Sequence, residues 1–404
     1  DRFKDKTKMR DDIWYEYDND LSNMDGVNYF DASIPDYLAG DTYQSGYFVT
    51  ANTLGMLSLS GPEDPNFDSY VMDEFAGGNY DAEEQIAAFY AMIVDKLGDD
   101  VTLIAGARFE STSINYTGQV FDEEEDELPS DIGSVSGGND YYNILPNLTL
   151  QWDVNDELNL NIAFTQSIAR PSYYDLVPYE YSNSDDQELA LGNPDLKSSL
   201  STNFDFMGEW YFGGLSLLSF GYFSKDIKDW IYQYTTNNYT YAGVNGYELS
   251  QLRNGEKASV SGFELGFQTK FLKNFTFMGN YTSTDSSTNN VEGRDDVPLT
   301  GQVDDMYNLS LAFENKKFFV RASMNYASEA LDKLSGDAYE DRYYDEQTFV
   351  DVNANYKVND NLSIFAEGKN LTNQPLRYYQ GIQQRTMQIE YYNLSWTVGL
   401  KYDF

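Results

Sequence analysis

The chain has 404 residues and a formal net charge of −40, from 66 acidic and 26 basic side chains. This charge excludes a nucleic-acid-binding protein, because phosphate contacts need clustered cations, and it disfavours binding at the surface of an anionic membrane. Cys and His are both absent, which removes disulfides, thiolate nucleophiles and the commonest general base and metal ligand. We therefore predict no enzymatic activity, no cofactor and no metal centre.

The first predicted element is a strand from Thr7 to Tyr17. The next segment, Ala82 to Leu97, is rich in Ala, Glu, Gln and Met, which are good helix formers, so an amphipathic helix is an alternative there. We predict a strand, because Gly98-Asp99-Asp100 leads directly into the strand Val101 to Glu110. A helix at this point would break an up-and-down order of strands.

From about residue 100 to the end, apolar side chains recur at every second position, which is the pattern of strands with one apolar and one polar face. The terminal segment shows it most clearly, with Tyr392, Leu394, Trp396, Val398, Leu400, Tyr402 and Phe404 alternating with small or polar residues. Aromatic residues make up 16% of the chain, including 35 Tyr, which suits interfacial aromatic girdles. These features predict an all-β fold, a transmembrane antiparallel up-and-down β-barrel.

Two kinds of connection alternate along the chain. Short turns of turn-forming residues are predicted at 98–100, 155–157, 213–214, 273–274, 315–316 and 359–361. Long loops are predicted at 18–78, 122–138, 169–196, 236–247, 288–300, 330–343 and 376–386. Together they imply about 14 strands, with the C-terminus on the short-turn, periplasmic side.

Several motifs along most of the chain resemble those of TonB-dependent outer-membrane receptors. The sharpest is Ser167-Ile168-Ala169-Arg170-Pro171-Ser172-Tyr173-Tyr174-Asp175-Leu176, followed by Gly192-Asn193-Pro194-Asp195-Leu196-Lys197. Glu367-Gly368-Lys369-Asn370-Leu371-Thr372-Asn373 and the terminal Tyr402-Asp403-Phe404 are similar to the late strands and closing signal of that family. In Gly192-Asn193-Pro194, the residue types themselves favour a turn at the end of a loop.

The resemblance implies a barrel of 22 strands with an N-terminal plug. On this basis residues 1–404 are expected to be the C-terminal portion of the barrel, with the plug, the first strands and the TonB box upstream. It also implies a Gram-negative outer-membrane location and active import of a scarce nutrient. The expected partners are outer-membrane lipid and lipopolysaccharide, the TonB energy-coupling complex, the nutrient ligand and, as a further candidate, a surface lipoprotein.

The predicted long loops are rich in Tyr, which offers a flat apolar face and a polar tip. The candidate ligand-binding residues are Arg170, Tyr173, Tyr174, Tyr179, Tyr181, Tyr239, Tyr241, Tyr344 and Tyr379. Structural roles are open alternatives: Arg170 could pair with barrel-lining carboxylates, and some tyrosines could belong to the upper girdle. An acidic mouth repels anions, which favours a neutral carbohydrate oligomer or a neutral or cationic metal chelate.

The densest charge cluster is Asp122-Glu123-Glu124-Glu125-Asp126-Glu127. A solvated loop is the simpler interpretation, and a Ca²⁺ or Mg²⁺ site or a cation bridge to lipopolysaccharide are alternatives. Two further functions compete with active import. One is a passive channel of 14 strands, and the other is a non-transporting adhesin or scaffold that uses its loops for protein contact.

Overall fold

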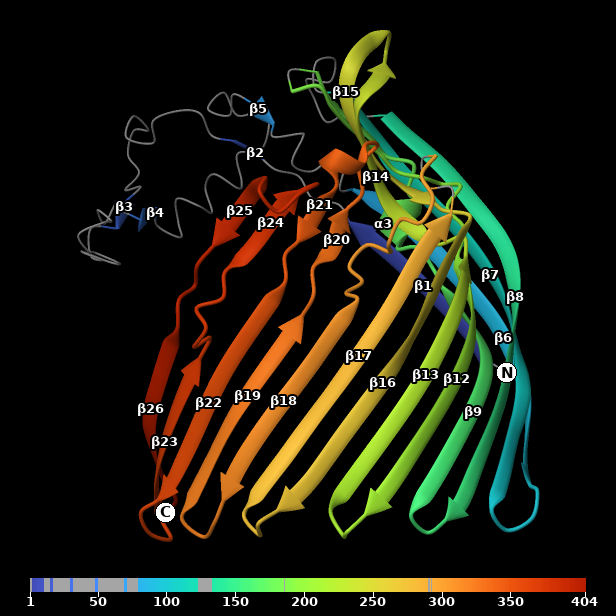
Figure 1. Ribbon diagram of the computed structural model, residues 1–404. Coiled ribbons are helices and arrows are strands. Elements are labelled where there is room, and N and C mark those ends of the chain that lie inside the picture. The colour runs from blue at the N-terminus through green and yellow to red at the C-terminus, as the bar shows by residue number, and fades with distance from the viewer. Residues whose placement is uncertain are drawn as a thin grey trace.

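The computed structural model describes residues 2–10, 15–16, 30–31, 48–49, 69–70, 79–122, 133–184, 186–289, 291 and 293–404. Its main feature is one curved antiparallel wall in which each strand pairs with the next (Figure 1). In the described residues this wall has 14 strands, which confirms the predicted number of about 14. In wall order they are β1 (Arg2–Arg10), β6 (Tyr80–Lys96), β7 (Val101–Asp122), β8 (Gly133–Asn155), β9 (Leu158–Ala169), β12 (Ser199–Phe212), β13 (Ser216–Lys228), β16 (Lys257–Phe271), β17 (Phe275–Asn289), β18 (Asp305–Glu314), β19 (Phe318–Ala327), β22 (Gln347–Lys357), β23 (Leu362–Lys369) and β26 (Ser395–Tyr402).

The alternation of side chains gives the wall an apolar outer face and a polar inner face. On β18, Leu309 and Leu311 lie on the outer face, whereas Asn308 and Ser310 lie on the inner face. The strand register aligns the outer residues into rows, and Tyr281, Tyr307 and Tyr326 are direct cross-strand neighbours. A row of tyrosines next to a band of leucine and phenylalanine is typical of the boundary of a lipid-facing surface.

The short turns lie at one end of the wall, together with the C-terminus (Figure 1). Three of them share one arrangement, in which an Asn side-chain oxygen accepts hydrogen bonds from the backbone amides two and three residues later. These residues are Asn155, Asn315 and Asn359. The side chain thus satisfies backbone donors that the ladder leaves unpaired, which explains why Asn marks these turns.

The segment with helix-forming composition is a strand, as predicted. β6 pairs with β7 from Tyr80↔Gly118 to Lys96↔Thr102, and its other edge pairs with β1. Pairing on both edges therefore overrides the intrinsic helix preference of this segment. The first strand starts at Arg2 rather than at Thr7, because its ladder to β6 begins at Arg2↔Ala88.

Three further predicted boundaries were wrong. β8 begins at Gly133, inside the expected loop 122–138, because its ladder to β7 continues to Val120↔Gly133. The expected loop 236–247 is instead a hairpin of β14 (Ile231–Tyr241) and β15 (Val244–Asn254) that turns at Ala242-Gly243. The terminal strand starts at Ser395 rather than at Tyr392, because Asn393 has a left-handed backbone with φ 59°.

The long loops carry structure of their own at the other end of the wall. They contain the short helix α3 (Tyr173–Leu176), the hairpin β10 (Glu180–Asn183) and β11 (Glu188–Leu191), and a small sheet. This loop sheet has the order β20 (Ala330–Lys333), β21 (Arg342–Tyr344), β24 (Leu376–Gln380), β25 (Thr386–Glu390), with the 3-10 helix η3 (Ala338–Glu340) before β21. Two further small pairs are β2 (Tyr15–Glu16) with β5 (Ser69–Tyr70), and β3 (Phe30–Asp31) with β4 (Phe48–Val49).

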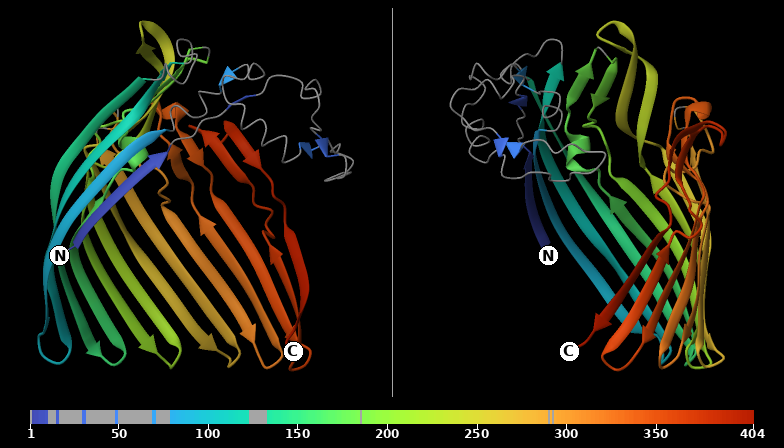
Figure 2. Two further views of the ribbon diagram at one scale, coloured as in Figure 1. Left: turned by 180° about the vertical axis from the view of Figure 1, so that it is seen from behind. Right: turned by 90° about the vertical axis from the view of Figure 1, so that its left-hand side faces the viewer.

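The hairpin β10–β11 bridges two distant parts of the wall. β10 runs parallel to the end of β7, and β11 runs parallel to β15. β15 leads directly into β16, and four strands of the wall, β8, β9, β12 and β13, separate β16 from β7. Within the described residues β1 and β26 are not paired with each other, and Figure 2 shows them at separate margins of the wall.

Among the helices that the structure describes, none combines the length and the apolar character needed to cross a membrane.

Candidate functional site

The predicted ligand-binding residues all lie at the long-loop end, but the structure divides them into three groups. Arg170, Tyr173, Tyr174 and Tyr179 surround α3. Tyr181, Tyr239 and Tyr241 lie where β10 meets the β14–β15 hairpin, and Tyr344 and Tyr379 lie in the loop sheet. The groups come from different loops, so each is described separately.

Helix α3 begins where the sequence motif contains Ser172. The Ser172 hydroxyl accepts from the amide of Asp175, and the Asp175 carboxylate accepts from the amide of Ser172. This reciprocal capping box satisfies donors at the helix start, and Pro171 before it fixes the backbone at the entry. The motif residues therefore set the position of Tyr173 and Tyr174.

The side chain of Arg170 points to carboxylates of the wall. Its Nη2 lies 2.5 Å from Oε2 of Glu110 and 3.2 Å from the Thr112 hydroxyl, and its Nε lies 3.9 Å from Glu84. Beside it, the Tyr173 hydroxyl donates to Glu84 over 2.9 Å. Burial, and then the hydrogen bond to the Glu84 carboxylate, raise the pKa of Tyr173, so its hydroxyl stays neutral.

Tyr174 and Tyr179 form a stacked pair with ring centroids 4.6 Å apart, and Tyr174 remains 36% exposed. Tyr179 is half-buried, and this burial raises its pKa. The pair rests on an apolar cluster of buried side chains from β6, β7 and the loop, namely Tyr80, Ala82, Ile114, Tyr116, Leu176, Val177 and Leu196. The buried cluster therefore fixes the position of the pair, while Tyr174 stays accessible to solvent.

The motif Gly192-Asn193-Pro194 fixes the C-terminal end of the loop 170–198. The Gly192 amide donates to the Tyr179 carbonyl over 2.9 Å, and a Cβ at Gly192 would lie 1.7 Å from the carbonyl oxygen of Val177. Asn193 donates to the carbonyl of Leu252, which anchors the loop to β15. Glycine is thus required here by close approach of two backbones.

The second group packs around the hairpin contact. The Tyr241 hydroxyl donates to Glu180 over 2.5 Å, and its ring meets that of Tyr247 edge-on at 5.3 Å. Tyr241 and Tyr239 both pack against a buried cluster formed by Leu189, Tyr247 and Leu249. Tyr181 lies in β10 beside Glu180. These residues join the hairpin β10–β11 to the hairpin β14–β15.

The loop sheet carries two tyrosine pairs on opposite faces, because the register sets Tyr343 opposite Tyr379 and Tyr344 opposite Tyr378. The rings of Tyr343 and Tyr379 stack on the face that points towards the protein interior, with centroids 5.2 Å apart and an angle of 8° between the ring planes. Tyr379 is only 3% exposed, and its hydroxyl donates to Glu329 over 2.6 Å. Burial and this hydrogen bond raise the pKa of Tyr379.

Tyr344 and Tyr378 form the other pair, with ring centroids 4.8 Å apart, and both are half-buried. The guanidinium of Arg342 lies 5.2 Å from the centre of the Tyr378 ring and 2.5 Å from the carboxylate of Asp332. We refer to Tyr344, Tyr378 and Arg342 as the open aromatic face. Arg342 and Tyr378 were not among the candidates predicted from the sequence, since only the strand register shows that they share a face with Tyr344.

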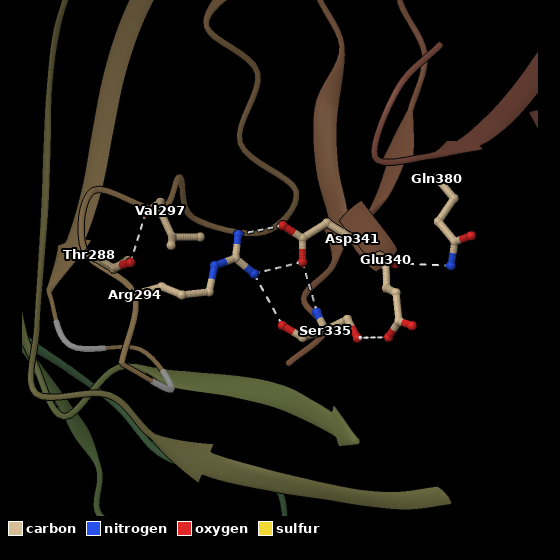
Figure 3. A network of polar contacts seen from close by, with 7 residues as sticks. All are labelled: Thr288, Arg294, Val297, Ser335, Glu340, Asp341 and Gln380. Atoms are coloured by element: carbon tan, nitrogen blue, oxygen red, sulfur yellow. Dashed lines mark hydrogen bonds and ion pairs between the residues drawn. The ribbon is translucent and has the colours of Figure 1, made fainter. Parts of the chain in front are cut away.

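A buried ion pair lies beneath the loop sheet (Figure 3). Arg294 reaches both carboxylate oxygens of Asp341, at 2.9 and 2.6 Å. The predicted acidic run 122–127 lies outside the described residues, apart from Asp122 at the end of β7. In the part of the chain that the structure describes, no group of three or more carboxylates is arranged to hold a metal ion.

Comparison with known proteins gives a consistent result. Residues 3–371 match the family described as TonB dependent receptor-like, beta-barrel. No curated protein matches the chain in sequence.

Similar solved structures include the ferric-catecholate import receptor Fiu of Escherichia coli K12, with a TM-score of 0.60 and 16% identity over 80% of this chain and 45% of that one. The copper transporter OprC has a TM-score of 0.59 and 14% identity over 80% and 48%. The ferric yersiniabactin uptake receptor FyuA of Yersinia pestis has a TM-score of 0.57 and 15% identity over 80% and 46%. At this identity the likeness establishes the fold, and the chain spans about half the length of each of these proteins.

Proposed function

Because the chain belongs to the TonB-dependent receptor β-barrel family, we propose that the protein imports a scarce nutrient across the outer membrane and captures it with its extracellular loops. Members of this family are outer-membrane β-barrels, and this chain is part of such a barrel. The long-loop end is then extracellular, and the short-turn end is periplasmic.

The observation that carries the proposal is the open aromatic face. Tyr344 and Tyr378 are half-buried and keep solvent-accessible surface on a sheet made only of loop segments, above the wall. The rings of Tyr344 and Tyr378 and the guanidinium of Arg342 form a flat surface of fixed geometry. Little side-chain entropy is lost when a ring-shaped ligand stacks on this surface, because its side chains are already ordered. Tyr379 supports this surface from its buried side.

The ligand class that we propose is a carbohydrate oligomer or a metal chelate. The net charge of −40 favours neutral or cationic ligands, because a strongly acidic protein repels anions. The similar receptors named above are described as binding ferric chelates or copper, which supports the chelate as one of the two classes. The Tyr174–Tyr179 pair is proposed as a second contact surface.

The energy for import is proposed to come from a TonB complex through an N-terminal plug. The wall is proposed to continue into a larger barrel, which is supported by the coverage of about half of each similar structure and, among the residues that the structure describes, by the unpaired outer edges of β1 and β26. Outer-membrane lipid and lipopolysaccharide are the proposed partners of the outer face. A surface lipoprotein is a further proposed partner of the loops.

Growth of a strain that lacks the native full-length protein tests this function. Oligosaccharides are supplied as the sole carbon source in one panel, and ferric chelates as the sole iron source in another. Complementation by wild type, but about ten-fold weaker uptake with Tyr378→Ala, is expected for a lost stacking contact of roughly 1–1.5 kcal/mol. Normal growth of the deletion strain on every compound in both panels would overturn the import function.

A further inference from the structure

The ion pair between Arg294 and Asp341 joins two extracellular loops. Arg294 belongs to the loop between β17 and β18, and Asp341 to the loop between β19 and β22, 47 residues later. The two nitrogens of the guanidinium fork each donate to one carboxylate oxygen (Figure 3). Arg294 also donates to the carbonyl of Ser335 over 3.1 Å, so it binds both ends of the turn that contains η3.

A third loop is attached to the same point. The carbonyl of Asp341 accepts from the amide of Gly381 over 2.8 Å, and the Gln380 side chain donates to the carbonyl of Glu340 over 3.3 Å. Gly381 directly follows β24, which carries Tyr378. Three loops that are separate in the sequence therefore meet at Asp341.

The surroundings make this ion pair costly to break. Asp341 is fully buried, and the side chain of Arg294 is 22% exposed. The hydrogen bond to Asp341 is the main reason that the pKa of Arg294 is raised. An apolar cluster from β14, β16 and the same loops lies close by, with Trp230, Val291, Val297, Leu331 and Leu334 among its members. In such a site salt screens the pair little, and removing one partner leaves a buried charge without compensation.

We propose that Arg294 and Asp341 are a positioning pair, which fixes the first loop to the two loops that β21 and β24 already join, so that the three loops behave as one body and hold the open aromatic face in place. The coupling of the loops is independent of any ligand. The role in holding Tyr344 and Tyr378 for a nutrient rests on the proposed function.

The Gly381 amide gives a sharp test of the coupling. Its acceptor is the backbone carbonyl of Asp341, which an Asp341→Asn substitution does not remove. Faster hydrogen exchange at Gly381 in that variant therefore reports that the third loop has moved. For the first loop, the hydrogen bond of 2.7 Å from the Gly301 amide to the Leu331 carbonyl also joins two loops and serves as the same kind of reporter.

The experiment is hydrogen exchange with mass spectrometry on the native full-length protein in detergent. Asp341→Asn is expected to speed exchange at least about ten-fold in peptides from all three loops, because a charge-assisted pair is lost from a buried site. Asp332→Asn is the matched control. It breaks an ion pair of 2.5 Å in the same loop sheet, but at side chains that are 42% and 30% exposed. Its effect is expected to stay within the peptides around Asp332 and its partner Arg342.

Exchange that rises only near residues 335–341 in Asp341→Asn would overturn the coupling. Barrel integrity is checked by heat-modifiable electrophoretic migration. If Asp341→Asn does not fold, Arg294→Lys answers the question, because it keeps the charge but loses the bidentate geometry. It is expected to loosen the same three loops to a smaller extent, and wild-type exchange in this variant would also overturn the proposal. If exchange shows that the loops are coupled but uptake by Tyr378→Ala is unchanged, the coupling stands and only the role of the face in ligand binding is rejected.

Discussion

The hydroxyl of Tyr173 donates a hydrogen bond of 2.9 Å to Oε2 of Glu84, which fastens helix α3 to the inner face of β6. The contact joins residues 89 positions apart in the chain, next to the ion pair of Arg170 with Glu110. The helix is only one turn long, so its position depends on contacts of this kind rather than on its own stability.

Replacing Tyr173 by Phe is expected to loosen the loop 170–198. The variant loses a hydrogen bond to a carboxylate at a partly buried site, which corresponds to about 1.5–3 kcal/mol. Amide exchange in this loop should rise while the wall stays protected. Tyr339→Phe is the control, because Tyr339 bonds the carboxylate of its neighbour Glu340 on an exposed surface. Equal exchange in both variants would contradict an anchoring role for Tyr173.

Substitution of Gly192 by Ala is expected to displace the loop, because the new Cβ would lie 1.7 Å from the Val177 carbonyl oxygen. Overpacking of this kind costs roughly 1–3 kcal/mol or more. Limited proteolysis should cut the variant faster within residues 170–198. Gly336→Ala provides the control, since no atom lies within 4 Å of a Cβ at that position. Wild-type resistance in Gly192→Ala would show that the backbones can separate without loss.

An alkaline titration should reveal tyrosines that ionise late, with Tyr173, Tyr179 and Tyr379 among them. Burial and, for two of them, a neighbouring carboxylate raise the pKa of Tyr173, Tyr179 and Tyr379 above the ordinary value of 10.0. The neutral forms are the ones that folding stabilises, so their contribution is complete below pH 10 and is lost as pH rises above it.

The ultraviolet absorbance of ionised tyrosine measures this effect directly. A late fraction should appear above the main transition, and loop release should accompany it. Tyr379→Phe should reduce the late fraction by one tyrosine. A single transition centred on the ordinary value would contradict the burial of these hydroxyls.

Charged substitutions on the two faces of β18 should differ. Leu311 lies on the outer face, so Leu311→Arg is expected to lower the stability of the barrel in lipid by about 2–4 kcal/mol if the residue lies near the bilayer midplane. Ser310→Arg, one residue earlier on the inner face, should cost much less. Folding into phospholipid vesicles, followed by heat-modifiable migration, compares the two. A larger loss for Ser310→Arg would reverse the assignment of the faces.

The wall could be predicted from the sequence because its signals are local. Alternation along each strand and an Asn at the turn, as at Asn315, need no knowledge of distant residues. Even the segment 82–97 was assigned correctly, because the turn after it constrained the order of strands. The boundary at Tyr392 failed because the alternation continues through Asn393, whose left-handed backbone breaks the strand.

The loops could not be predicted in the same way, because their pairing joins distant segments. Tyr344 and Tyr379 looked equivalent in the sequence, but the register of β21 on β24 places them on opposite faces. The pairing of Arg294 with Asp341 has no local signal at all. The motif residues of the loop 170–198 were found, whereas the contact of Arg170 with Glu110 was anticipated only as one of two alternatives.

The bridge made by β10 and β11 has a consequence for the order of assembly. β10 pairs with β7 and β11 pairs with β15, so both partners must be in place before the hairpin can bind. Closing contacts over such sequence distances costs chain entropy that only the completed contacts offset. The hairpin should therefore be the last part of this end to become protected during refolding, and the first to open when denaturant is added.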